Sequence, residues 1–147
     1  MQCMIAAVLL ATVLAGPAVA EDLKKAYRDK EHVVRVEPLL TPPVKSVVGE
    51  DIFYPGGTAA EISAAIIELP PGQATPWHRH GVPLFAYILS GELQVDYADK
   101  GVRTFGPGQA FMEAMNQRHR GVNNGKEPVR LIAVYMGAKN MKNVIGE

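Results

Sequence analysis

Turn-forming residues interrupt this chain about every eight to twelve residues from position 33 onward, so only short elements fit between them. The interruptions include Pro42-Pro43, Pro55-Gly56-Gly57, Pro70-Pro71-Gly72, Ser90-Gly91, Gly106-Pro107-Gly108 and Asn123-Asn124-Gly125. Residues 92–97, the clearest of the intervening segments, alternate polar and apolar side chains, which predicts a half-buried strand. No long helical periodicity follows the N-terminal region. The pattern predicts an all-β fold, a sandwich or a barrel.

The N-terminal segment differs from the rest of the chain. Residues 4–20 are uncharged, rich in alanine, valine and leucine, and end in Ala18-Val19-Ala20 before a charged stretch. This predicts a secretory signal peptide over residues 1–20 and a periplasmic or secreted protein. The run is short for a membrane span, although an uncleaved N-terminal anchor is the alternative. We expect an N-terminal arm with leading strands over residues 21–49 and a barrel domain over residues 50–147.

The composition excludes several classes of chemistry. Cys3, the only cysteine, lies within the predicted signal peptide, so the mature chain would have neither disulfides nor thiolate ligands. The 15 basic and 15 acidic residues cancel and form no block of one sign. We therefore expect no nucleic-acid partner and, after signal cleavage, no membrane partner. A soluble exported domain is the expectation that remains.

Three of the four histidines are spaced so that they can meet in space. His78 and His80 flank Arg79, and alternate residues of a strand point to the same face, so both imidazoles can face an interior while Arg79 points outward. His119, on a later strand, could join them across a barrel. Three neutral imidazoles predict one divalent transition metal, with Fe, Zn, Ni and Cu favoured and Mn favoured only if carboxylates predominate.

Two stretches around these histidines resemble the two sequence motifs of the cupin superfamily. The first matches at Gly72, His78, His80 and Gly91 but has Leu84 in place of the motif's glutamate. The second matches at Gly108, His119 and Asn123, with Ala114 and Asn116 in place of proline and glycine. The resemblance, to small single-domain cupins of the conserved-barrel type, covers roughly residues 50–137. It implies a jelly-roll β-barrel, an internal metal held by the motif histidines, and frequent homodimers.

The second motif also contains two candidate catalytic residues. Strand alternation places Glu113 on the same face as Phe111, and members of the family usually have inward-pointing apolar residues at both positions. A buried Glu113 would have to ligate the metal, hydrogen-bond a ligating histidine, or stay protonated as a general acid or base. A register slip of one residue would instead expose it. Gln117, on the expected face of His119, is a candidate pocket-lining amide, whereas Asn123 opens a turn and is expected to hydrogen-bond locally.

The alternating residues of segment 84–89 present two apolar faces. One of them should line the barrel, and the more aromatic one, with Phe85 and Tyr87, should pack on a partner sheet or subunit, which fits a homodimer.

The motifs leave the reaction open, because cupin barrels host many unrelated functions. Three-histidine iron cupins that resemble this arrangement are often dioxygenases of small substrates. A metal-assisted lyase, isomerase or hydrolase is equally compatible if Glu113 ligates the metal. The alternatives are a non-catalytic barrel that binds a small ligand or a metal, and a metal-free barrel used for protein association.

Overall fold

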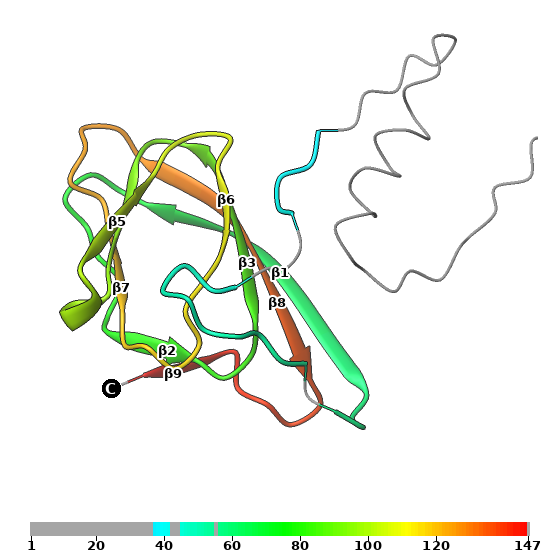
Figure 1. Ribbon diagram of the computed structural model, residues 1–147. Helices are drawn as coiled ribbons and strands as arrows, with labels where there is room; N and C mark the ends of the chain where they lie inside the picture. Colours follow the sequence, from blue (N-terminus) through cyan, green and yellow to red (C-terminus); the bar gives the residue numbers. More distant parts are fainter. Residues whose placement is uncertain (1–36, 42–44, 55, 147) are drawn as a thin grey trace, which may run out of the picture. The chain divides into compact units, whose positions relative to one another are not determined.

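The computed structural model describes residues 37–41, 45–54 and 56–146 (Figure 1). The chain divides into two units, residues 1–43 and 44–147, and the second contains every strand in the described part. The predicted signal peptide and most of the predicted arm lie outside the described residues. Within the described ranges, no helix is long and apolar enough to span a membrane.

The described residues form nine strands and one short 3-10 turn, which confirms the predicted all-β fold. The elements are β1 (Ala60–Leu69), β2 (His78–His80), β3 (Leu84–Ser90), β4 (Leu93–Asp96), the turn η1 (Ala98–Lys100), β5 (Val102–Phe105), β6 (Ala110–Met112), β7 (Arg120–Val122), β8 (Val129–Ala138) and β9 (Val144–Gly146).

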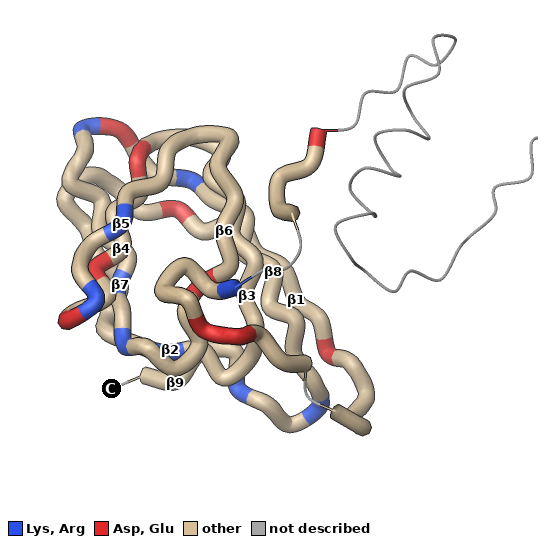
Figure 2. The backbone as a smooth tube through the Cα atoms, in the orientation of Figure 1, with Lys and Arg blue, Asp and Glu red and all other residues tan. Residues whose placement is uncertain are grey.

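The strands pair antiparallel in three sheets, with the orders β1-β8-β3-β6, β5-β4-β7 and β2-β9. Figure 1 shows the two larger sheets on opposite sides of the barrel, with β2 and β9 at one end. An isolated bridge between His78 and His119 joins the segment of β2 to the chain just before β7. Basic and acidic residues are interspersed over the barrel in the view of Figure 2.

The core follows the period-two alternation of the strands. On β3 the buried side chains are Leu84, Ala86 and Ile88, so this face lines the barrel. The alternate face of β3, with Phe85 and Tyr87, is half-buried on the outside. The alternation of β4 likewise buries Leu93 and Val95 and continues to Tyr97, which is fully buried just after the strand.

The hairpin between β3 and β4 depends on a glycine. Gly91 has a φ of +75°, which side-chain-bearing residues seldom adopt. A Cβ atom at this position would lie 2.7 Å from the carbonyl oxygen of Pro128. The predicted tight turn at Ser90-Gly91 therefore has both a conformational and a steric reason.

Two segments outside the strands have their own hydrogen bonds and ion pairs. Residues 46–49 form a tight turn between Lys45 and Asp51, which are joined by a bridge and an ion pair. Asn123 is fully buried, and its Oδ1 accepts from the backbone N–H of Gly125, as expected of a turn-opening asparagine. Its Nδ2 donates to the carbonyls of Leu69 and Glu127 and thereby joins β1 to the turn before β8.

Candidate metal centre

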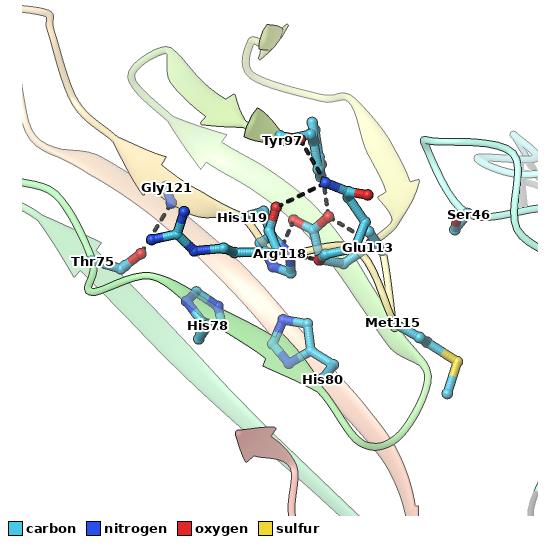
Figure 3. A network of polar contacts seen from close by, with 12 residues as sticks. Ser46, Thr75, His78, His80, Tyr97, Glu113, Met115, Arg118, His119 and Gly121 are labelled. Carbon is cyan, nitrogen blue, oxygen red and sulfur yellow. Dashed lines mark hydrogen bonds and ion pairs between the residues drawn. The ribbon is translucent and has the colours of Figure 1, made fainter. Parts of the chain in front are cut away.

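The three motif histidines converge inside the barrel, as their spacing predicted. His78 and His119 lie opposite one another, and each backbone N–H donates to the other's carbonyl at 2.9 Å. The ring centroid of His78 is 5.0 Å from that of His80 and 4.5 Å from that of His119. One nitrogen from each of the three rings lies within 4.8 Å of the others. Figure 3 shows the three imidazoles gathered from β2 and from the chain before β7.

Backbone carbonyls orient all three rings in the same way. The Nδ1 atom of His78 is 2.8 Å from the carbonyl oxygen of Pro76, that of His80 is 3.0 Å from Asn143, and that of His119 is 2.9 Å from Gln117. Because a carbonyl can only accept, Nδ1 must carry the proton in each ring. Each neutral ring therefore keeps its Nε2 lone pair free, the arrangement by which a hydrogen-bonded carbonyl prepares a histidine to ligate a metal.

The environment of the rings fits a metal. The Nε2 atom of His119 is buried and has no hydrogen-bond partner, an arrangement that is costly unless the lone pair binds something. Burial lowers the pKa of all three imidazoles, that of His80 to about 4. The rings are therefore neutral near pH 7, the state that metal binding requires. The donor set suits Zn, Cu, Ni or Fe.

Glu113 is a buried carboxylate beside the histidines. It is only 6% exposed and lines the same cavity as Phe111, so the inward register is the one that the chain adopts. Its Oε1 accepts from the Tyr97 hydroxyl at 2.6 Å and from the Ala114 backbone N–H at 2.7 Å. Its Oε2 lies 3.9 Å from Nε2 of His119. Burial raises the pKa of Glu113 to about 7.

The grouping of metal-ligating atoms contains the three histidines without Glu113. Oε2 of Glu113 lies next to that group, so the role of Glu113 as a fourth metal ligand stays a prediction. Leu84, at the position of the motif's glutamate, is buried and lines the cavity with an apolar side chain.

The histidines and Glu113 open onto a cavity of about 70 Å³. Most of its wall is apolar, and the lining residues are Ile67, Leu69, Thr75, His78, His80, Leu84, Ala86, Leu93, Val95, Phe111, Glu113, His119, Gly121, Leu131, Ala133 and Tyr135. This volume accommodates a few water molecules or a small ligand.

Two tyrosines of the site were missed by the sequence reasoning. Tyr97 holds Glu113, and Tyr135 lines the cavity with its ring 5.9 Å from that of His80. Both could have been found from alternation, because Tyr97 follows Leu93 and Val95 at period two, and Tyr135 follows Leu131 and Ala133 in the same way.

Gln117 does not line the cavity. Its Nε2 donates to the carbonyl of Tyr97 at 2.8 Å and to Oδ1 of Asp99 at 3.0 Å, and the residue is not among those that line the cavity. The expected face was wrong because residues 115–117 form a bend, so strand alternation does not extend from His119 back to Gln117. The amide side chain instead ties the bend to the segment that follows β4.

Comparisons with known proteins agree with this architecture. Residues 65–135 match the Cupin_2 family, described as a cupin domain. No curated protein matches the chain. The polyketide cyclase RemF from Streptomyces resistomycificus is 20% identical, with 76% of this chain and 85% of that chain covered and a TM-score of 0.51. A cupin domain from Bordetella pertussis Tohama I is also 20% identical, covering 52% of this chain and 82% of that one, with a TM-score of 0.46.

The oxalate decarboxylase from Lactobacillus farciminis is 27% identical over 58% of this chain, with a TM-score of 0.48. The matched region spans 26% of that longer chain. The likeness to RemF agrees with the strand topology. The chain thus has an all-β barrel fold of the cupin type, and residues 65–135 are similar to the cupin-domain family model.

Proposed function

We propose that this protein is a metal-dependent enzyme that acts on a small molecule inside the barrel. The observation that carries the proposal is the convergence of three imidazoles, each with Nδ1 bound to a backbone carbonyl, beside a buried carboxylate. In this proposal His78, His80 and His119 hold one divalent ion: Fe, Zn, Ni, Cu or Mn. Once bound, such an ion would supply Lewis acidity toward an oxygen atom of the substrate.

The chain's own residues favour a small, anionic oxygen-bearing substrate. The three imidazoles are neutral, and Leu84 contributes no charge where the motif has a carboxylate, so the histidine shell does not offset the charge of the cation. The cavity of about 70 Å³ fits a small ligand, and its mostly apolar wall favours a ligand with a carbon body.

Glu113 is the proposed proton-transfer group. Tyr97 and the Ala114 backbone hold its Oε1, which leaves Oε2 facing the histidine cluster. With a pKa of about 7, the carboxyl can give or take a proton at Oε2 near neutral pH. This supports a metal-assisted lyase or isomerase, and a dioxygenase-like reaction is the other class that we propose for this site.

Elemental analysis tests the metal. We expect about one transition-metal ion per chain in protein purified without added metal, and none in His119→Ala. Arg79→Ala is the matched control, because Arg79 lies between the two ligating histidines on β2 and its side chain is exposed. A wild-type protein that neither retains nor takes up a transition metal would overturn the proposal.

A non-catalytic barrel that binds a small ligand or the metal itself is the second candidate, and the small, mostly apolar cavity favours it. The variant Glu113→Gln separates the two. An enzyme would keep its metal and its affinity for small carboxylates but lose turnover in a screen of such compounds. A binding protein would show no turnover in either form.

We also propose that the chain is exported and forms a homodimer. Export is supported by the apolar run at residues 4–20, and mass determination of the mature protein from periplasm or medium tests it. Dimerisation is supported by the outer face of the four-stranded sheet. There Ile62 and Ile66 are 66% and 60% exposed, and they pair with Met136 and Ile132 of β8. Light scattering should give twice the chain mass for the wild type, and the chain mass for a double Ile62→Ser, Ile66→Ser variant.

A further inference from the structure

The loop between β6 and β7 touches every part of the candidate metal centre. Glu113 begins this loop and His119 ends it. In between, the carbonyl of Met115 accepts from the backbone N–H of His80 at 3.1 Å, and the carbonyl of Gln117 accepts from Nδ1 of His119 at 2.9 Å. Residues 115–117 form a bend without strand pairing, so contacts from elsewhere must fix the path of the loop.

The carboxylate of Glu50 binds the backbone in the middle of this loop. Oε2 of Glu50 accepts from the backbone N–H of Met115 at 2.8 Å, and its Oε1 accepts from the backbone N–H of Asn116 at 3.0 Å. Hydrogen bonds between a carboxylate and backbone N–H groups are charge-assisted and about twice as strong as neutral ones. Two successive N–H groups bound by one carboxylate restrain both the position and the orientation of the bend.

Hydrogen bonds from the turn at residues 46–49 hold the Glu50 carboxylate in place. Oγ of Ser46, a buried residue, donates to Oε2 of Glu50 at 3.0 Å and accepts from the Glu50 backbone N–H, also at 3.0 Å. The backbone N–H of Val47 donates to the carbonyl of Met112 at 2.9 Å, which ties the turn to β6. Figure 3 shows Ser46 on the far side of Met115 from the histidines.

We propose that Glu50 is a positioning residue of the metal centre: it holds residues 115 and 116 so that the loop presents Glu113, His119 and the backbone contact to His80 in one geometry. Glu50 is not among the residues that line the cavity, and it lies before the cupin-matched residues 65–135. This inference rests on the proposed function, because it assumes that the three histidines bind a metal.

The test measures Co²⁺ affinity of the full chain by competition with a chromophoric chelator. Glu50→Ala should weaken binding about tenfold, the lower end of what the loss of a residue that supports metal ligands costs. The Co²⁺ affinity of Glu50→Gln should lie between those of the wild type and Glu50→Ala. The amide keeps one acceptor oxygen but turns a donor toward the second backbone N–H. Asp51→Ala is the matched control: it removes an exposed ion pair with Lys45 in the same turn and should leave the affinity unchanged.

The Co²⁺ absorption spectrum at saturation distinguishes positioning from a general loss of stability. A misplaced loop should change the spectrum of Glu50→Ala, whereas simple destabilisation would leave the saturated spectrum as in the wild type. Ser46→Ala, which keeps the carboxylate but removes its support, should show a smaller effect of the same kind and decides the matter if Glu50→Ala does not fold.

If the Glu50 variants bind Co²⁺ with the affinity and the spectrum of the wild type, the positioning role is overturned and the proposed metal site is unaffected. If the Glu50 variants do not fold, the same result in Ser46→Ala overturns the positioning role. Absence of Co²⁺ binding by the wild type would instead overturn the proposed function, and this inference with it.

Discussion

The buried carboxylate of Glu113 should control how the stability of the metal-free protein depends on pH. The informative perturbation is Glu113→Gln. The amide oxygen can still accept from the Tyr97 hydroxyl and from the Ala114 backbone N–H, so the packing and both hydrogen bonds are retained. What is removed is a negative charge in a site that is 6% exposed.

The size of the effect follows from the pKa of Glu113, which burial raises from an ordinary 4.5 to about 7. At about 1.36 kcal/mol per pKa unit, this difference corresponds to about 3 kcal/mol. Because the folded-state pKa is raised, the stability contributed by the neutral carboxyl is fully present below pH 4.5 and is lost as the pH rises through 7. The advantage of Glu113→Gln over the wild type should therefore grow from near zero at about pH 4.5 to about 3 kcal/mol at about pH 8.5.

Urea unfolding of the chelator-treated proteins between about pH 4.5 and 8.5 measures this difference. The histidines are common to both proteins, so their titration largely cancels in the comparison. Glu68→Gln is the matched control: this carboxylate is exposed on β1 near Arg130, and its loss should change the free energy of unfolding by less than about 1 kcal/mol. A wild-type protein as stable as Glu113→Gln at the upper end of this pH range would refute a buried carboxylate of raised pKa.

Three further predictions concern the same cavity. Leu84→Glu should lower the stability of the metal-free protein by about 3 kcal/mol, because it buries a carboxyl in an apolar wall, and should bind Mn²⁺ more tightly than the wild type in chelator competition. Tyr97→Phe should destabilise the protein by about 1 to 3 kcal/mol at about pH 8.5 in urea unfolding, and by less at about pH 5, because the lost donor serves the ionised Glu113. Burial lowers the pKa of His80 to about 4, so protons should compete with the metal only well below about pH 6. Gel filtration at graded pH followed by elemental analysis should show that the protein retains its metal at about pH 6 and loses it near pH 4.

Local patterns predicted those features of the fold that depend on neighbouring residues. Turn residues marked where strands end. The alternation of residues 92–97 predicted a half-buried strand, and in the structure Leu93 and Val95 of this segment are buried in the core. His78 and His80 were expected on one face because a strand repeats every two residues, and the structure brings His119 opposite them. The same rule failed at Gln117, because a bend interrupts the strand before His119.

The sequence by itself determined a β-fold, a set of three histidines at metal-binding spacing, and a carboxylate, Glu113, in the segment that leads to His119. Only the tertiary structure decided what surrounds these groups. Tyr97, just after β4, donates to Glu113, just after β6 of another sheet, and Glu50 accepts from the backbone of Met115, 65 residues away along the chain. Such contacts arise when the barrel closes, and no period of two or of about 3.6 residues encodes them. Hydrogen-bond partners and burial, which set the protonation of the site, are therefore properties of the closed barrel.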